Sequence, residues 1–281
     1  MRDFKLHFVT VFLAVAVVGS CGTRHETQPV TAILGAFDVE VELIKTAMTE
    51  KRDTTFMGIT YTVGKLKGRR VALAEAGIGK VNAAVTTTLL IEHFRPGEII
   101  FTGIAGGLNP VLQPGDIVIG ARTAQHDYSL LTADGPHNVG TKNPISGDRN
   151  PVFFAADARL LRLAKEASTH AKLKRIPAVG GERTPRIVEG VIATGDAFIA
   201  SDPKKKELRD RLGADAVEME GAAVAQVCFQ FGVPCLVVRS ISDLADASAV
   251  NDVERFYRIA ADNSASFVLV VVGLIAREEL E

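Results

Sequence analysis

Two hydrophobic patterns alternate along the chain. Short apolar runs that end at glycine or at a polar residue are typical of buried strands, and longer stretches with an apolar residue every three or four positions are typical of amphipathic helices. Their alternation predicts a single α/β domain over residues 31–281, with a mostly parallel sheet flanked by helices. The predicted strands are Thr31–Leu34, Val71–Ala74, Glu98–Phe101, Asp116–Ile119, Val188–Ala193 and Pro234–Val238.

Helical patterns follow several of these strands. One helix begins after Gly35, another ends near His93, and a third spans roughly residues 219–230 and stops at Gly232, a common helix terminator. The last helix, about residues 252–279, is predicted to be a core helix, because its densest apolar run is too short to cross a bilayer. The polar residues 121–151 predict a long surface loop, a type of segment that often forms a lid or an interface.

Three carboxylates stand out because they lie beside buried segments. Glu218 and Glu220 lie where the third helix begins, and Asp243 follows the strand Pro234–Val238. Cleavage of a sugar–base bond needs such a pair of positions, since one group must hold the sugar and another must protonate the leaving group. A solvated surface charge is the alternative for any one of these acids alone.

Two glycine-rich turns follow predicted strands. Gly77-Ile78-Gly79 looks like the start of a dinucleotide-binding turn, but the third glycine and the later ribose-binding acid are out of register, which favours a tight structural turn. Thr102–Gly107 has glycine at positions 103, 106 and 107, which allows positive φ and a close approach of backbone to a ligand. By itself this segment fits a tight turn as well as it fits a ligand platform.

Taken in order, six segments resemble the nucleoside phosphorylase and nucleosidase superfamily, and most closely its methylthioadenosine/S-adenosylhomocysteine nucleosidases. The resemblance implies a three-layer, Rossmann-like α/β sandwich with a central mixed, mostly parallel sheet. It also implies hydrolysis of the N-glycosidic bond of adenine nucleosides, without a cofactor or a metal. The segments are Gly35–Val41, Gly77–Ala84, Thr102–Gly107, Gly195–Ile199, Val217–Glu220 and Arg239–Asp243.

The resemblance implies three catalytic residues. Glu40 would take a proton from the attacking water, and Asp243 would share a proton with N7 of adenine. Glu220 would hold the ribose hydroxyls, and a carboxylate close to the sugar stabilises the positive charge of an oxocarbenium-like transition state.

Further residues would bind the substrate. Phe198 would lie against adenine, with the backbone of Ile199 and the Ser242–Asp243 segment at the edge of the base. Met219 would pack on the sugar, within the ribose-binding segment that also holds Glu218. Arg239 would either order the water or pair with an acid. The glycine-rich turn would contribute Ile104 and Gly106.

Water is predicted to be the nucleophile. Phosphorylases of this superfamily usually carry an arginine in the opening loop, where this chain has Asp38 and Glu40, which would repel a phosphate dianion. The glycine-rich turn commonly supplies a hydroxyl group where this chain has Ile104. Isoleucine cannot bond phosphate.

Several alternatives stay open. A futalosine-type hydrolase or a purine nucleoside phosphorylase would share most of these motifs, and a surface protein that binds nucleosides without turnover would share the fold. His126 and Asp127 could reach the substrate or simply be solvated. The polar residues around His137, Asn138 and Lys142 would suit a polar 5′ substituent.

The N-terminus resembles a bacterial lipoprotein signal. Two basic residues precede an apolar run from Phe8 to Val18, and small residues then lead to Cys21. This pattern predicts a signal peptide over residues 1–20, a lipidated cysteine with a tether over residues 21–30, and export to the periplasm or cell surface with a membrane anchor at Cys21. An ordinary signal peptide or an uncleaved anchor is the alternative.

The composition of the chain gives little indication of binding partners. The formal net charge of −1 gives no reason to expect nucleic acid, and the six histidines have no metal-ligand spacing. Cys228 and Cys235 are predicted to be small buried residues, with their pairing left open. The family resemblance implies a homodimer in which the 121–151 loop closes the neighbour's site.

Overall fold

The computed structural model describes residues 29–178 and 180–278. The predicted signal peptide, Cys21 and the tether as far as residue 28 lie outside this range. Within it, most of the backbone belongs to one sheet and six helices. The main-sheet strands are β1 (Thr31–Gly35), β2 (Thr49–Phe56), β3 (Ile59–Leu66), β4 (Arg69–Glu75), β5 (Glu98–Phe101), β6 (Ile104–Gly107), β7 (Ile117–Gln125), β10 (Phe153–Ala155), β13 (Ile187–Thr194), β14 (Ala216–Glu218) and β15 (Cys235–Asp243).

Among the described residues these eleven strands form one mixed sheet in the order β10-β7-β13-β14-β6-β15-β5-β1-β4-β3-β2. β1 is parallel to β4 and β5, and β15 is parallel to β5 and β6. β7 pairs with β13 along one edge and with β15 along the other, so the strands β7, β13, β14, β6 and β15 close into a ring. Two small hairpins lie outside this sheet: β8 (Ser129–Thr132) with β9 (Gly135–Asn138), and β11 (Ile176–Ala178) with β12 (Gly181–Arg183).

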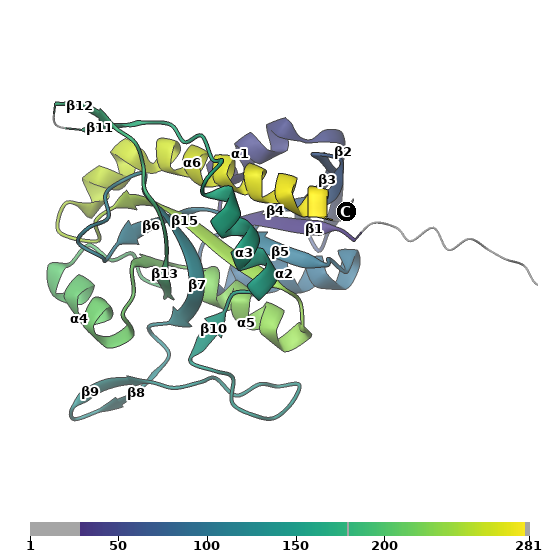
Figure 1. The fold of residues 1–281 in the computed structure, drawn as a ribbon. Coiled ribbons are helices and arrows are strands. Elements are labelled where there is room, and N and C mark those ends of the chain that lie inside the picture. Colours follow the sequence, from purple (N-terminus) through teal and green to yellow (C-terminus); the bar gives the residue numbers. More distant parts are fainter. Residues whose placement is uncertain (1–28, 179, 279–281) are drawn as a thin grey trace, which may run out of the picture.

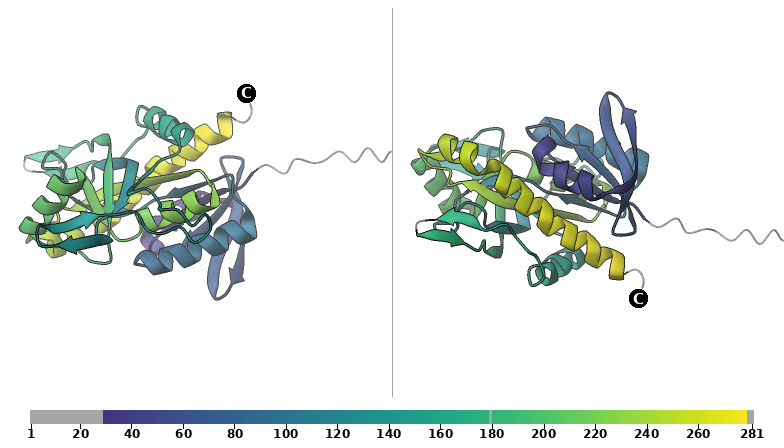
Figure 2. Two further views of the ribbon diagram at one scale, coloured as in Figure 1. Left: turned by 90° about the horizontal axis from the view of Figure 1, so that it is seen from below. Right: turned by 90° about the horizontal axis from the view of Figure 1, so that it is seen from above.

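Helices cover both faces of the sheet (Figures 1 and 2). Successive residues of a strand point to opposite faces, so Ile33 packs in the cluster under α1, α3 and α6, whereas Leu34 packs in the cluster under α2 and α5. The predicted three-layer sandwich is therefore confirmed. The helices are α1 (Asp38–Ala47), α2 (Lys80–Phe94), α3 (Ala158–Ala167), α4 (Asp202–Leu212), α5 (Gly221–Phe231) and α6 (Ala249–Glu278).

The longest helix, α6, is long and apolar enough to cross a membrane by length and composition. Its apolar stripe is nevertheless buried inside the protein, where Phe267, Val268 and Val271 have no exposed surface. The prediction of a core helix is confirmed. Cys228 on α5 and Cys235 on β15 are also buried, and both are free thiols.

The surface loop predicted over residues 121–151 is wrong at its start. β7 continues to Gln125, and the β8–β9 hairpin follows, which projects away from the main sheet (Figure 1). The hydrophobic pattern of the sequence did not predict three further elements, which are α3, α4 and the β2–β3 hairpin. β2 is largely exposed and its sequence TEKRDTTF has almost no apolar residue, so no hydrophobic alternation marks it as a strand.

Candidate active site

One cavity of about 360 Å³ collects the predicted catalytic residues Glu40, Glu220 and Asp243. They come from the first turn of α1, the entrance of α5 and the end of β15, respectively. The cavity lies at the carboxyl ends of β1, β14 and β15, where ligands bind in sheets of this type.

Glu40 is held by the turn that joins β1 to α1. Its carboxylate accepts hydrogen bonds from the backbone N–H of Ala36 at 2.5 Å and of Ile104 at 2.9 Å. Glu40 is the third residue of α1, and an acid at this position commonly accepts a hydrogen bond from a backbone N–H group at the start of its helix. The helix dipole favours the ionised form of such an acid. Burial has the larger effect and raises the pKa of Glu40 to about 7, against the opposing charge of Arg239. The group therefore changes protonation state close to neutral pH.

Glu218 and Glu220 have different roles at the start of α5. The Glu218 carboxylate accepts the backbone N–H groups of Glu220 at 3.1 Å and Gly221 at 2.6 Å, so this side chain caps the helix. It also accepts the Thr194 hydroxyl and the Arg239 guanidinium, the latter at 2.7 Å. Because Glu218 fills the capping role, the Glu220 side chain can turn to the cavity.

Glu220 is bound only by the backbone N–H of Gly79, at 2.7 Å, among the described residues. Burial raises its pKa, and the negative charge of Glu218 raises it further. Arg239 partly opposes this, but its guanidinium is already paired with Glu218 and lies over the Phe101 ring at 4.1 Å. Of the two roles considered for Arg239, pairing with an acid is therefore the one observed.

Asp243 ends β15 and is almost fully buried. Its carboxylate accepts the Ser242 hydroxyl at 2.8 Å and the backbone N–H of Ala245 at 2.9 Å. Burial raises the pKa of Asp243 above its usual range, so the protonated form is favoured more than in water. A carboxyl group that keeps its proton can donate it to a leaving group.

The glycines of the predicted turn Thr102–Gly107 have a steric function. Residues 104–107 form β6 instead of a tight turn, and positive φ is found at none of the three glycines. A Cβ atom would lie 2.5 Å from a Glu40 carboxylate oxygen at Gly103 and 2.9 Å from an Asp243 carboxylate oxygen at Gly106. Close approach to the two acids explains these glycines. The turn Gly77–Gly79 does need positive φ, at 76° and 96°.

The remaining predicted binding residues lie around the same space. Ile104, Gly106, Met219 and Ser242 line the main cavity, and Phe198 stands at its rim with half of its surface exposed. Ile199 lines a small side cavity of about 30 Å³ that shares Phe198 and Asp243 with the main one. A flat ring placed between Phe198 and Asp243 would therefore contact both the main cavity and the side cavity.

His126 and Asp127 support the site from outside and do not line this cavity. The His126 ring packs beneath Gly195, where a Cβ atom would come within 2.3 Å of the ring nitrogen. Asp127 pairs with Lys80 at 2.6 Å and accepts the backbone N–H of Asp196 at 2.9 Å. Both residues thus hold the loop that leads to Phe198.

The polar residues of the hairpin are also engaged elsewhere. His137 contacts the Thr132 hydroxyl, and Asn138 donates to the Gln125 carbonyl and accepts from Arg211. None of them lines the cavity, so within this chain they do not face the 5′ end of a substrate placed there.

Several residues that line the main cavity were not predicted from the sequence. Val253, Glu254 and Tyr257 of α6 form one wall of the cavity, and Phe37 and Ile78 form another. Phe37 and Ile78 stand inside recognised motifs without any polar group to suggest a role. The α6 residues are far along the chain, and only the tertiary fold brings them to the acids.

The described residues contain no group of three or more histidine, cysteine, aspartate or glutamate side chains that could hold a metal ion. Lysine, arginine and histidine are likewise absent from the lining of the cavity in that part of the chain. The arrangement is suited to proton transfer and to stabilising positive charge, and it offers no cationic cradle for an anion.

Comparison with known proteins gives a consistent result. A sequence model described as the phosphorylase superfamily matches residues 30–273. The chain is similar to 5′-methylthioadenosine/S-adenosylhomocysteine nucleosidase from Marinomonas sp. (strain MWYL1), with 41% identity over 241 residues, 85% of this chain and 96% of the relative.

Solved structures agree. The nucleosidase of the same description from Neisseria meningitidis, in complex with methylthio-immucillin-A, has a TM-score of 0.74 and 36% identity, covering 88% of this chain and 99% of that one. A native futalosine hydrolase of Helicobacter pylori strain 26695 has a TM-score of 0.75 and 33% identity, covering 87% and 97% of the two chains. The fold alone therefore does not separate these two activities.

Proposed function

The chain belongs to the phosphorylase superfamily and, within it, to the 5′-methylthioadenosine/S-adenosylhomocysteine nucleosidases, and on this basis we propose how its site cleaves a nucleoside. The enzyme hydrolyses the N-glycosidic bond of adenine nucleosides. The observation that carries the proposed mechanism is the convergence of three buried carboxyl groups, Glu40, Glu220 and Asp243, on one cavity, each with a raised pKa.

Asp243 is the general acid. Its raised pKa favours the protonated form more than in water, and Ser242 and Ala245 fix the direction of the carboxyl group. Proton transfer to N7 makes adenine a neutral leaving group as the glycosidic bond breaks. The adenine ring lies against Phe198, where the two cavities share Phe198, Gly106 and Asp243.

Glu220 binds the ribose hydroxyls. Its single backbone hydrogen bond leaves carboxyl oxygen capacity for them. As the sugar gains positive charge, the ionised form of Glu220 becomes favoured, because an opposite charge close by lowers the pKa of a carboxyl group. The interaction is stronger in the transition state than in the ground state, which is the requirement for catalysis.

Glu40 is the general base for water. A pKa of about 7 places it near the pH at which a base is most effective. Phosphate is disfavoured as the nucleophile, since Arg239 is paired with Glu218 and no cationic side chain of the described residues lines the cavity. The three acids also weigh against the alternative of a binding protein without turnover.

The test is a product assay on the purified chain. Methylthioadenosine, S-adenosylhomocysteine, adenosine and inosine are incubated with and without phosphate, and free base and sugar are measured. We expect adenine and the free ribose product without phosphate. Futalosine is included as a fifth substrate. Strict dependence on phosphate would overturn the hydrolytic mechanism, and turnover of futalosine alone would assign the second activity.

A homodimer is part of the proposal. Leu130 and Leu131 of the β8–β9 hairpin are exposed, as are Val81 and Val85 on α2 and Phe229 on α5. Exposed apolar groups on a projecting hairpin and on two helices favour contact with a second copy. Light scattering should give twice the monomer mass, and Leu131→Glu should lower it; a wild-type monomer would refute this.

The cellular location is also a proposal, supported by the N-terminal pattern that ends at Cys21. We infer an exported lipoprotein with the catalytic domain tethered to a bacterial membrane. Metabolic labelling with a fatty acid should mark the wild-type chain, and Cys21→Ala should abolish the label. An unlabelled wild-type chain in the cytoplasmic fraction would refute the anchor.

A further inference from the structure

Lys80 connects three segments beside the main cavity without lining that cavity. It is the first residue of α2 and ends the turn Gly77–Lys80. Its ammonium group contacts the carboxylates of Asp127 at 2.6 Å and Asp196 at 4.0 Å, and its backbone N–H donates to the Asp196 carboxylate at 2.8 Å. Asp127 follows β7 and Asp196 follows β13, so one lysine joins segments that are distant in sequence.

A further contact closes this cluster. Asp127 accepts the backbone N–H of Asp196 at 2.9 Å as well as the Lys80 ammonium. Burial would raise the pKa of Asp127, but the hydrogen bonds from Lys80 and from the Asp196 N–H outweigh it and lower the pKa. Only 18% of the Lys80 side chain is exposed, so solvent screens these contacts less than it screens a pair on the open surface. We call Lys80, Asp127 and Asp196 the lysine bridge.

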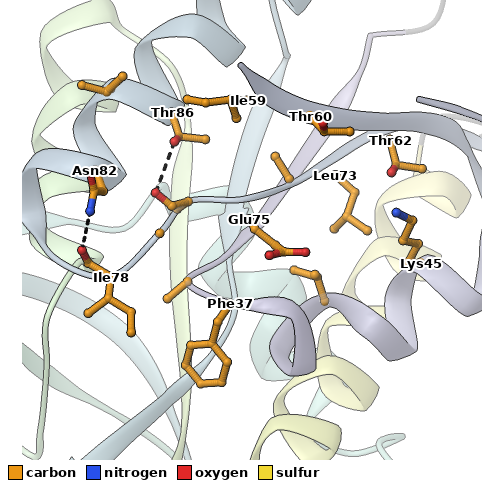
Figure 3. Close-up of a pocket in the computed structure, with 16 residues that line it drawn as sticks. Phe37, Lys45, Ile59, Thr60, Thr62, Leu73, Glu75, Ile78, Asn82 and Thr86 are labelled. Carbon is orange, nitrogen blue, oxygen red and sulfur yellow. Dashed lines mark hydrogen bonds between the residues drawn. The ribbon is translucent and has the colours of Figure 1, made fainter. Parts of the chain in front are cut away.

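One end of the lysine bridge holds Glu220. The backbone N–H of Gly79, the residue before Lys80, donates to the Glu220 carboxylate at 2.7 Å and is the one hydrogen-bond donor to it within the described residues. The turn around Gly79 is closed on its other side, where the Asn82 amide donates to the Ile78 carbonyl at 2.7 Å (Figure 3). A shift of Lys80 would therefore move the group that orients Glu220.

The other end of the lysine bridge holds the loop that carries Phe198. Phe198 lies two residues after Asp196, and half of its surface is exposed, so packing alone constrains it weakly. The start of this loop is fixed independently of Lys80, since the Gly195 N–H donates to the Glu218 carbonyl at 3.1 Å. The bridge thus determines where the loop lies relative to the turn before α2.

We propose that Lys80 is a positioning residue for nucleoside hydrolysis. It sets the separation between Glu220, which binds the ribose, and Phe198, which lies against adenine. A nucleoside contacts both groups at once, so a site that is already ordered by Lys80 does not have to be ordered by the substrate. This inference rests on the roles of Glu220 and Phe198 in the proposed function, and it adds a residue that does not touch the substrate.

Lys80→Met tests the bridge on the purified chain. Methionine keeps the apolar stem and the backbone N–H but loses the ammonium group, so Asp127 and Asp196 would repel each other. Because the bridge is partly exposed, we expect kcat/KM for methylthioadenosine to fall about three- to tenfold, through both a higher KM and a lower kcat. Lys80→Arg keeps the positive charge and should lose less. Unchanged kinetics in Lys80→Met, or equal losses in the two variants, would overturn the inference.

Binding of adenine alone separates positioning from general damage to the site. The free base needs the Phe198 end of the site, where the contacts of Gly195 and Asp127 remain in Lys80→Met. Its dissociation constant, measured by titration calorimetry, should therefore stay close to wild type while the KM for methylthioadenosine rises. A matching loss of affinity for adenine would overturn the inference, since the base-binding loop itself would then depend on Lys80.

Asp127→Asn completes a double-mutant cycle with Lys80→Met. Both changes break the same bridge, so the double variant should lose much less than the product of the two single losses, and multiplicative losses would contradict the bridge.

Lys174→Met is the matched control. Lys174 pairs with Asp262 at 2.6 Å and does not line the main cavity, so the variant loses the same charge and an equally short ion pair. Its kcat/KM should match wild type, and a loss comparable to that of Lys80→Met would overturn the inference. Failure of the proposed function is distinct, because the wild-type chain would then not cleave methylthioadenosine at all.

Discussion

The two ends of the central strands bury carboxylates in opposite ways. At the amino end, Glu98 begins β5 and accepts hydrogen bonds from Arg69 at 2.7 Å, Arg159 at 2.5 Å and Thr31 at 2.5 Å. At the carboxyl end, Glu40 and Asp243 are equally buried, but within the described part of the chain each is bound by backbone N–H groups or a hydroxyl and by no cation.

The carboxylates at the two ends therefore have different functions, one structural and the other chemical. A buried carboxylate with direct cationic partners joins segments that are distant in sequence, here β1, β4, β5 and α3. A buried carboxylate without such a partner has a raised pKa, which for Glu40 is about 7, so this group can gain or lose a proton near neutral pH. Substitution at the two ends should therefore affect different measurements.

Asp243→Asn should have the largest effect. Asparagine keeps the shape and can still accept the Ala245 N–H, but it cannot deliver a proton, so kcat should fall by about 10²- to 10⁴-fold, the usual contribution of general acid catalysis. Steady-state kinetics with methylthioadenosine measure this. Asp246→Asn, which removes a carboxylate three residues away that does not line the cavity, should keep wild-type turnover; comparable losses in both would argue against a specific role for Asp243.

Glu98→Gln should act on stability alone. Loss of the negative charge removes the acid that Arg69 and Arg159 share, while Arg159 keeps its ion pair with Glu278. Removal of one member of a buried ion pair typically costs about 3–5 kcal/mol. Urea denaturation measures the loss. The kcat of the remaining folded protein should match wild type, so a drop in both quantities would mean that the two ends are coupled.

Much of this contrast could be predicted from sequence, because the three acids of the active site stand beside buried strands or helix entrances in recognisable motifs. The role of Glu218 could not, since its capping of α5 depends on where Thr194 and Arg239 lie in the fold. The wall formed by Tyr257 and its neighbours depends on how α6 crosses the sheet. The contact of Arg69 with Glu98 likewise depends on strand order, which local patterns do not encode.

Glu40→Gln should change how stability depends on pH. The folded chain keeps the Glu40 proton up to about pH 7, whereas the unfolded chain loses it near 4.5. The folded state thus binds more protons in this window, and wild-type stability should fall as pH rises through it, by up to about 3 kcal/mol from this one group. Denaturation of the ligand-free protein at pH 5 and pH 8 should show a flatter dependence for the variant. Glu92→Gln should keep the wild-type slope, and parallel curves for Glu40→Gln would contradict the raised pKa.

Gly106→Ala should have the smallest effect on the site. The new methyl group would lie 2.9 Å from the Asp243 carboxylate and would shift that group or the edge of the adenine. Crowding of this kind typically costs about 1–3 kcal/mol, so kcat/KM should fall by roughly tenfold or somewhat more.

Gly107→Ala is the matched control for this change. The neighbouring residue of β6 faces the other way, where its Cβ atom would lie 3.2 Å from Ile241 instead of an acid. Its cost should be seen in the midpoint of denaturation and much less in kcat/KM. If both variants lose activity equally, β6 acts as a rigid unit, and the glycine at position 106 is required for packing of the strand instead of for access to Asp243.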